Sequence, residues 1–254
     1  MRFDVVTLFP ELFAPHLVHG VTRRAFQDGV VDVRLWPLRD FADNAYRRVD
    51  DRPYGGGPGM VMLAEPLERA LAAVRVSRGE TGGEIAPLVL FTPAGERLDQ
   101  RRVRDWARGR GAVLLCGRYE GVDQRFVDRH VDVELSLGDF VLSGGELPAL
   151  ALLDAVARLQ PGVLRDAESH LQDSFSHGLL DWPHYSRPEV LPDDCGGAAV
   201  PEVLLSGHHA RIGRWRREQA LALTAQRRPD LIDAARAAGI LNGADENYLK
   251  SLSL

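Results

Sequence analysis

Residues 112–137, AVLLCGRYEGVDQRFVDRHVDVELSL, are typical of a strand, a glycine-containing turn, a helix and a second strand. The apolar runs 112–117 and 131–137 have the length of buried strands, and the segment 122–131 has helical spacing. Strands that are buried on both faces and joined by crossover helices lie parallel in one sheet. This unit therefore predicts an α/β fold with a mostly parallel sheet.

The same alternation extends over the first two-thirds of the chain. Three more apolar or β-branched runs have strand length, at 3–8, 30–36 and 86–91. Four more segments have helical spacing, at 21–29, 64–79, 98–111 and 146–159. We therefore expect residues 1–160 to form one α/β domain.

The last third of the chain has a different character. Residues 161–200 are rich in Pro, Gly, His and Asp and have no sustained period, which is typical of a functional loop or a linker. Helical spacing returns from Pro201 onward. We expect 161–200 to be a flexible connector between domains, and 201–254 to form a small helical domain.

The composition is that of an ordinary globular protein. The 254 residues are 45% hydrophobic, and the net charge of −5 disfavours a protein that only coats nucleic acid. The apolar runs are too short to cross a membrane, and Asp4 and Pro10 interrupt any signal-peptide core. Cys116 and Cys195 lie far apart, so neither a disulfide framework nor a thiolate zinc site is indicated. We expect a cytoplasmic protein with no membrane partner.

One stretch of the chain is nevertheless strongly basic. Residues 211–228 contain six arginines and a single acid, Glu218. Taken alone, such a run is more often a solvated helix face than an RNA-binding surface. A local basic stripe is still the electrostatic footprint that RNA binding requires.

Three glycine-rich segments, 52–62, 116–125 and 137–146, indicate a binding site. The last two follow predicted strands, and the predicted strand 86–91 leads into a further turn at 92–99. In open α/β sheets ligands bind beyond the carboxyl ends of the strands, where glycine lets main-chain groups approach a ligand closely. One such loop is better explained as a tight turn, but three after successive strands favour a pocket.

The expected pocket suits a flat heterocycle. The chain lacks the glycine signatures of dinucleotide and P-loop sites, the nucleophile elbow of hydrolases and the HExxH motif of zinc enzymes. Its only lysine is Lys250, which disfavours a triphosphate site. Main-chain hydrogen bonds between apolar walls recognise a heterocycle, and the apolar residues expected here are Leu90, Phe91, Leu137, Phe140 and Leu142.

Several polar side chains are candidates for chemistry, and the residue pattern alone does not choose among them. Arg158 follows Asp154 by four residues, so an intrahelical ion pair and a role in stabilising charge on a substrate are equally compatible with it. His208 and His209 lack a third ligand nearby, which disfavours a metal site. The residues able to handle a proton are Asp173, Ser174, His177, Asp181 and His184.

Five motifs resemble those of one enzyme family. They are RPYGGGPGM (52–60), CGRYEGVDQR (116–125), GDFVLSGGELPA (138–149), DSFSHGLLDWPHYSRPEVL (173–191) and VLLSGHHARIGRWRREQ (203–219). Together and in this order, they resemble the bacterial tRNA (guanine-N1)-methyltransferases of the TrmD type over nearly the whole chain. Five long motifs in register support the resemblance far more strongly than any one of them.

The resemblance implies a SPOUT-class α/β fold whose chain forms a deep trefoil knot, an architecture that general topology rules treat as exceptional. It also implies an obligate homodimer in which each active site draws on both protomers. The implied reaction moves a methyl group from S-adenosyl-L-methionine to N1 of the guanosine immediately 3′ of the tRNA anticodon, position 37. A dependence on Mg²⁺ is implied too, although the sequence offers no cluster of ligands for it.

The resemblance also implies roles for individual residues. Asp173 matches the general base and Arg158 the catalytic arginine, while residues 161–177 would order over bound tRNA as a lid. Residues 201–254 would bind tRNA. The cofactor pocket would be lined by Leu90, Phe91, Thr92, Pro93, Gly117, Tyr119, Glu120, Gly121, Leu137, Gly138, Phe140, Leu142, Gly144 and Gly145. The tRNA would be contacted by Gly59, Arg118, Ser174, His184, Arg211, Arg214 and Arg217.

Two alternatives to this function remain open. A methyltransferase of the same knotted class that acts on another RNA would share the cofactor loops but not the tRNA-facing helix. A non-catalytic RNA-binding module fits poorly with the acidic net charge and with the pocket-like glycine loops. Measurement of methyl transfer to tRNA transcripts that differ at the nucleotide 3′ of the anticodon distinguishes these two alternatives from the tRNA methyltransferase.

Overall fold

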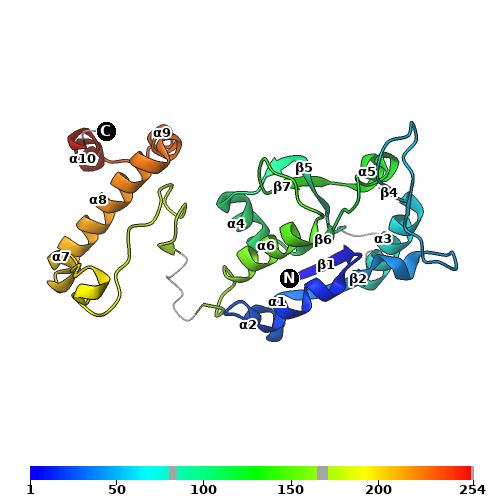
Figure 1. The fold of residues 1–254 in the computed structure, drawn as a ribbon, viewed down its shortest axis with the longest axis horizontal. Helices are drawn as coiled ribbons and strands as arrows, with labels where there is room; N and C mark the ends of the chain where they lie inside the picture. The colour runs from blue at the N-terminus through cyan, green and yellow to red at the C-terminus, as the bar shows by residue number, and fades with distance from the viewer. Residues whose placement is uncertain (80–84, 165–170, 253–254) are drawn as a thin grey trace. The chain divides into compact units, whose positions relative to one another are not determined.

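The computed structural model of the chain describes residues 1–79, 85–164 and 171–252. The chain divides into two compact units, Met1–Ala167 and Glu168–Leu254, and each has a hydrophobic core of its own (Figure 1). The first unit is an α/β domain and the second is helical. Within the described ranges, no helix is long and apolar enough to span a membrane.

A five-stranded parallel sheet forms the centre of the first unit. Its strands are β1 (Arg2–Thr7), β2 (Asp32–Pro37), β5 (Leu88–Arg97), β6 (Gly111–Leu115) and β7 (Val133–Ser136). Their order is β2-β1-β6-β5-β7, and every pairing between neighbours is parallel. The predicted α/β class with a mostly parallel sheet is therefore confirmed. β5 extends beyond the predicted 86–91, because its last residues pair with β7 again after an irregularity.

Helices cover both faces of this sheet, because alternate residues of a strand point to opposite sides. In β6, Ala112 and Leu114 join one core cluster, whereas Val113 and Leu115 join the other. The first face is covered by α1 (Ala14–Val18), α2 (Arg23–Gln27), α4 (Gln100–Arg108) and α6 (Glu146–Ala157). The second is covered by α3 (Ala64–Arg78), α5 (Gln124–His130) and the short 3-10 helix η2 (Leu38–Phe41). Figure 1 shows the resulting three layers.

The helix boundaries follow local sequence signals. α3 ends at Gly79, whose φ of +73° is the left-handed conformation that glycine adopts readily, so the predicted glycine stop is confirmed. α4 begins after Asp99, whose side chain accepts a hydrogen bond from the amide of Arg102 at 2.8 Å. α6 lies within the predicted helix 146–159, and Arg158 is its C-cap.

A buried carboxylate joins β1, β2 and the end of α3. Asp4 is fully buried and accepts hydrogen bonds from Arg2 at 2.7 and 2.9 Å. Arg78 donates to it at 2.7 Å, and the indole nitrogen of Trp36 donates at 2.8 Å. Burial of an ionised carboxylate is costly unless hydrogen bonds and opposite charges compensate for it. These three side chains provide both.

A short hairpin lies outside the main sheet. β3 (Asp50–Asp51) and β4 (Val61–Met62) pair antiparallel, and the glycine-rich segment 52–60 connects them. The sequence indicated the turn but not the two strands, because two residues are too few to show a period of two.

The second unit consists of helices and a long irregular segment. Its helices are α7 (Glu202–Leu205), α8 (His209–Arg227), α9 (Pro229–Ala237) and α10 (Gly243–Ser251). Residues 171–200 are mostly irregular, and Leu179 from this segment packs with Leu221 and Ile232 in the core of the unit. Residues 165–170 of the predicted connector lie outside the described residues.

The last helix, α10, was not predicted. Asn242 caps it by accepting hydrogen bonds from the amides of Ala244 and Asp245 at 2.9 and 3.0 Å. The Asp245 side chain in turn accepts from the amide of Asn242 at 3.0 Å, which completes a capping box. The spacing of these two residues is a sequence signal that locates the start of the helix.

Candidate active site

The middle of β5, at residues 90–94, and the loops that follow β6 and β7 line one cleft of about 490 Å³ in the first unit. The cleft lies at the carboxyl ends of parallel strands, where ligands bind in open α/β sheets. All fourteen residues predicted for the cofactor pocket line it: Leu90, Phe91, Thr92, Pro93, Gly117, Tyr119, Glu120, Gly121, Leu137, Gly138, Phe140, Leu142, Gly144 and Gly145. The fold thus brings three segments that are distant in sequence to one place.

Main-chain atoms form part of the cleft wall, because two glycines let neighbouring loops touch. The amide of Gly145 donates to the carbonyl oxygen of Gly117 at 2.9 Å. A Cβ atom at Gly145 would lie 2.7 Å from the Cα of Cys116, and one at Gly144 would overlap the Nε of Arg118. Close approach to main chain therefore requires glycine at position 145, whereas a side chain at position 144 would require the Arg118 side chain to move.

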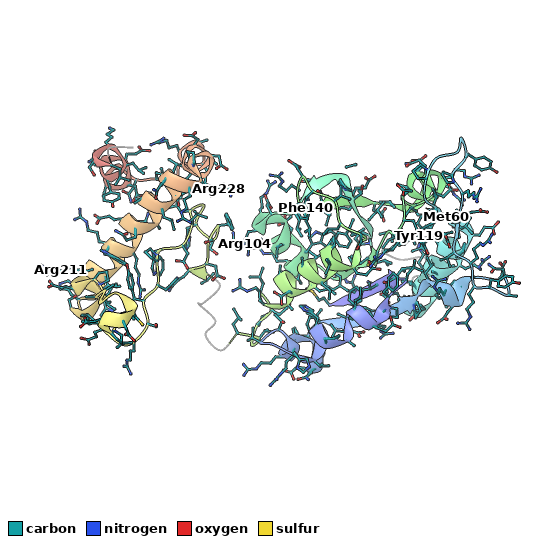
Figure 2. The ribbon with its side chains drawn as sticks, in the orientation of Figure 1. Met60, Arg104, Tyr119, Phe140, Arg211 and Arg228 are labelled. Carbon is teal, nitrogen blue, oxygen red and sulfur yellow. The ribbon has the colours of Figure 1, made fainter. Side chains whose placement is uncertain are left out.

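The β3–β4 hairpin is fixed to the loop after β6. The amide of Glu120 donates to the carbonyl of Met60 at 3.0 Å, and that of Met62 donates to the carbonyl of Gly121 at 2.9 Å. Figure 2 shows Met60 beside Tyr119. Gly59, a predicted tRNA contact, is so close to Glu120 that a Cβ atom would overlap its side chain. The hairpin therefore lies against residues that line the cleft.

The lining of the cleft fits S-adenosylmethionine. Leu90, Leu137 and Leu142 supply apolar surface, and the glycine loops supply main-chain donors and acceptors. The glycines leave main-chain groups at the wall uncovered by side chains, and at Gly145 an added Cβ atom would collide with the main chain of Cys116. Glu120 and Glu134 add negative charge, which suits a ligand with positive groups. A volume of about 490 Å³ is also within the usual range for small-molecule sites.

Behind the cleft lies a buried polar network that the sequence did not reveal. Glu146, the first residue of α6, is only 1% exposed. One carboxylate oxygen accepts a hydrogen bond from the hydroxyl of Thr7 at 2.8 Å, and the other accepts from Nε of Arg118 at 2.8 Å. Arg118, a predicted tRNA contact, is therefore engaged within the protein on one edge. Its partner lies 28 positions away and Thr7 lies 139 positions from Glu146, so no local pattern indicates this network.

Cys116 lies next to this network at the end of β6. Burial raises the pKa of its thiol well above the usual value, the nearby Glu146 raises it further, and Arg118 acts in the opposite direction. The thiol therefore stays protonated at neutral pH and is a poor nucleophile. Cys116 and the exposed Cys195 are both free.

Arg158 lies away from the cleft of its own chain. It follows the last residue of α6, whereas Gly144 and Gly145 precede the first. With a rise of 1.5 Å per residue, Arg158 is about 18 Å along the helix from Glu146. Asp154, on the same helix, lies 3.8 Å from Nε2 of His16.

The second unit brings the five proton-handling candidates together. Asp173, His177 and Asp181 line a hollow of about 250 Å³. The amide of Asp181 donates to the hydroxyl of Ser174 at 2.9 Å, and Nε2 of His184 lies 2.9 Å from an oxygen of the Asp181 carboxylate. Three of the five therefore line this hollow, which holds the predicted base Asp173, and the other two are joined to Asp181.

Three of the four arginines predicted to contact tRNA lie on α8, and their surroundings differ. Arg211 is exposed at the start of the helix, and Arg228 follows its end (Figure 2). Arg214 is mostly exposed and donates to Glu218 at 2.9 Å. Arg217 donates to the buried Asp245 at 2.8 and 3.1 Å and thereby ties α8 to α10. Arg211 and Arg214 therefore present more free guanidinium surface than Arg217.

Comparison with known proteins identifies the family to which these motifs belong. A family model described as tRNA (Guanine-1)-methyltransferase TrmD matches residues 1–234. The chain belongs to the TrmD family. A TrmD-family relative from Leptothrix cholodnii is 72% identical over 254 residues, which is 100% of both chains, and is named tRNA (guanine-N(1)-)-methyltransferase. Relatives with the same name from Methylibium petroleiphilum and Paracidovorax citrulli are 72% and 68% identical, and the matches cover at least 98% of each chain.

Membership of the TrmD family confirms the resemblance of the motifs and makes the chain a tRNA (guanine-N1)-methyltransferase. Among the described residues of this TrmD chain, no group of three or more His, Cys, Asp or Glu side chains is arranged to hold a metal ion. The roles of individual residues in the cofactor cleft and on α8 remain predictions. Sequence reasoning missed Glu146 and Thr7 behind the cleft, and also four polar residues of its lining, Gln124, Glu134, Ser136 and Ser143.

Proposed function

We propose that this enzyme transfers a methyl group from S-adenosyl-L-methionine to N1 of the guanosine at position 37, immediately 3′ of the tRNA anticodon. The observation that carries the proposal is the single cleft lined by all fourteen predicted cofactor residues. The names of the relatives specify tRNA and N1 of guanine, while position 37 follows from the motif resemblance. We place the activity in the cytoplasm, where tRNA is modified.

The chain's part in cofactor binding is to hold and orient. Leu90, Leu137 and Leu142 would pack against the adenine ring, and the main chain of 117–121 and 137–145 would meet its polar edges. When bound, the cofactor supplies an electrophilic methyl group on a positively charged sulfur. Because the loops pack main chain against main chain, they hold this orientation without costly rearrangement.

The target base needs help from two side chains. N1 of guanine carries a proton at neutral pH, and Asp173 accepts it as general base. The negative charge that then develops on O6 is stabilised by the guanidinium of Arg158. The guanosine has to leave its stack to reach the cleft. The proposed lid is residues 161–177, of which 165–170 lie outside the described residues.

We also propose that the chain is threaded as a SPOUT trefoil knot and works as a homodimer. Arg158 lies about 18 Å along α6 from the cleft of its own chain, so a cleft that uses Arg158 draws it from a second copy. Exposed apolar side chains around the cleft offer surface for that copy, since Phe140, Val141 and Leu147 are all more than half exposed.

The helical second unit is the proposed tRNA-binding domain. Arg211 and Arg214 on α8 would contact phosphates, together with Arg217, Ser174 and His184. Gly59 and Arg118 would contact the RNA from the first unit. The described residues offer no ligand cluster for Mg²⁺, so no residue is assigned to it.

Replacement of Asp173 tests the catalytic assignment. Asp173→Asn should lower single-turnover methyl transfer by about a hundredfold or more, while the affinity for adenosylhomocysteine, which the first unit would bind, stays unchanged. Asp194→Asn, in the exposed part of the same segment, is the matched control and should remain active. Near-normal activity of Asp173→Asn would overturn its assignment as the base.

Substrate specificity is tested with unmodified tRNA transcripts that carry each of the four nucleotides at position 37. Radiolabelled methyl transfer should occur only where guanosine is present. Methylation that ignores this nucleotide would favour a methyltransferase of the same class with another RNA target. Cofactor binding without any methyl transfer would favour an RNA-binding module.

A further inference from the structure

The carboxylate of Glu146 is placed where it can control the shape of the cleft. It stands at the start of α6, immediately after the glycine loop 143–145 that lines the cleft. Its side chain is 1% exposed, and its two oxygens are used by Thr7 and Arg118, each at 2.8 Å. A carboxylate at a helix N-terminus is also favoured by the helix dipole. Two hydrogen bonds therefore hold the carboxylate in one position, and the helix dipole favours its charge.

Arg118 connects this carboxylate to both cleft loops. It belongs to the loop after β6, and its Nη1 donates to the carbonyl oxygen of Ser143 at 3.0 Å and to the hydroxyl of Ser143 at 3.3 Å. Its guanidinium also lies 4.5 Å from the centre of the Phe9 ring. With Nε on Glu146 and Nη1 on Ser143, the guanidinium ties the loop after β6 to the loop after β7.

Gly144 leaves the space that the Arg118 side chain occupies. The side chain of Arg118 passes so close to Gly144 that a Cβ atom there would overlap its Cδ and Nε atoms. Only 18% of the Arg118 side chain is exposed, so the guanidinium has little freedom to take another position. Of its contacts, Ser143 lines the cleft and Glu146 follows the lining residue Gly145, whereas Phe9 lies beyond the end of β1.

We infer that Glu146 is a positioning residue for the cofactor: through Arg118 it holds the loops after β6 and β7 at the separation that S-adenosylmethionine requires, and Thr7 holds Glu146. The inference rests on the proposed function, because it assigns the cofactor to this cleft. A charge-assisted hydrogen bond is stronger and more directional than a neutral one, so the negative charge of Glu146 matters, and not only its shape. Nε and Nη1 of Arg118 already donate to Glu146 and Ser143, so the predicted contact of Arg118 with RNA would be made by Nη2.

The test is the affinity for adenosylhomocysteine and for S-adenosylmethionine in the absence of tRNA, measured by isothermal titration calorimetry on the full chain. Glu146→Gln removes the charge and leaves the side-chain shape. It should raise both Kd values by about tenfold, the equivalent of about 1.4 kcal/mol. In turnover assays the KM for S-adenosylmethionine should rise by a similar factor, with a smaller change in kcat, because no group that touches the reacting atoms is altered.

Two substitutions of Thr7 test the same network with a smaller change than Glu146→Gln. Thr7→Val removes the hydroxyl that donates to Glu146 and accepts from the amide of Phe9 at 3.0 Å. It should weaken binding in the same direction, whereas Thr7→Ser keeps the hydroxyl and should bind as the wild type does. If Glu146→Gln does not fold, the difference between these two variants decides the question.

Asp4 supplies the matched control. It is a fully buried carboxylate in the same unit, held by Arg2, Arg78 and Trp36, and it does not line the cleft. Asp4→Asn should lower the Tm without changing either Kd. If Glu146→Gln behaves in the same way, with a lower Tm and unchanged Kd values, Glu146 is only structural and the inference is overturned. If the wild-type chain binds neither adenosyl ligand, the proposed function itself fails.

Discussion

Replacement of Gly145 by alanine adds one methyl group where the two cleft loops touch. The new Cβ atom would lie 2.7 Å from the Cα of Cys116, 3.0 Å from the nitrogen of Gly117 and 3.2 Å from the carbonyl carbon of Cys116. All three are main-chain atoms, which cannot turn aside as a flexible side chain can. Gly145 has φ −79° and ψ −4°, which alanine adopts without strain, so the expected effect is steric alone.

The size of the effect follows from these distances. Carbon atoms in contact prefer about 3.5–4.0 Å, so the loops have to separate by about 1 Å. Overpacking of this kind costs about 2 kcal/mol, which corresponds to a decrease in Tm of roughly 4–8 °C for a chain of this size. The same movement stretches the 2.9 Å hydrogen bond from Gly145 to Gly117, so the affinity for adenosylhomocysteine should fall as well.

Thermal unfolding and calorimetric titration of the purified variant measure both effects. Gly213→Ala is the control for stability, because Gly213 lies inside α8 with no atom within 4 Å of its added Cβ. Alanine there should raise the Tm, since it stabilises a helix by up to about 1 kcal/mol relative to glycine. An unchanged Tm and an unchanged Kd in Gly145→Ala would refute the steric argument.

Two further predictions concern titratable groups. Burial raises the pKa of Cys116, so a thiol reagent at pH 8 should modify one cysteine, Cys195, in the native chain and both after denaturation; rapid modification of Cys116 in the native chain would contradict this. The hydrogen bond from Arg217 lowers the pKa of Asp245, so this carboxylate stabilises the fold above its ordinary pKa and the stabilisation is lost as the pH falls through the lowered value. The Tm difference between the wild type and Asp245→Asn should therefore be largest near neutral pH and shrink below about pH 4; a difference that is independent of pH would disprove the link.

The features that the sequence predicted well are those encoded by neighbouring residues. The strands and crossover helices of the first unit have periods that can be read within a single segment, and Gly79 ends α3 where a glycine stop is expected. The cleft followed from glycine-rich loops after successive strands, because parallel strands place their carboxyl ends at one edge. The residues predicted for the cofactor do line one cleft, and that the cleft binds the cofactor stays a prediction.

The features that could not be predicted from the sequence depend on partners distant in the chain or on very short elements. Glu146 looks like an ordinary acid in the first turn of a helix until Thr7 and Arg118 are seen on either side of it. The two-residue strands β3 and β4 exist only as a pair, and neither has a pattern of its own. α10 differs from these features, because the residues of its capping box, Asn242 and Asp245, are a local sequence signal from which the start of the helix could have been predicted.

The main-chain wall at Gly117, Gly144 and Gly145 also limits how the enzyme can evolve under pressure from an inhibitor. A compound that hydrogen-bonds to amides and carbonyls, rather than to side chains, offers few positions at which a substitution removes a contact. A side chain introduced at Gly145 would exclude the compound only by pushing the loops apart, and the cofactor proposed for this cleft would need the same loops. Resistance by point substitution in this wall should therefore carry a loss of fitness.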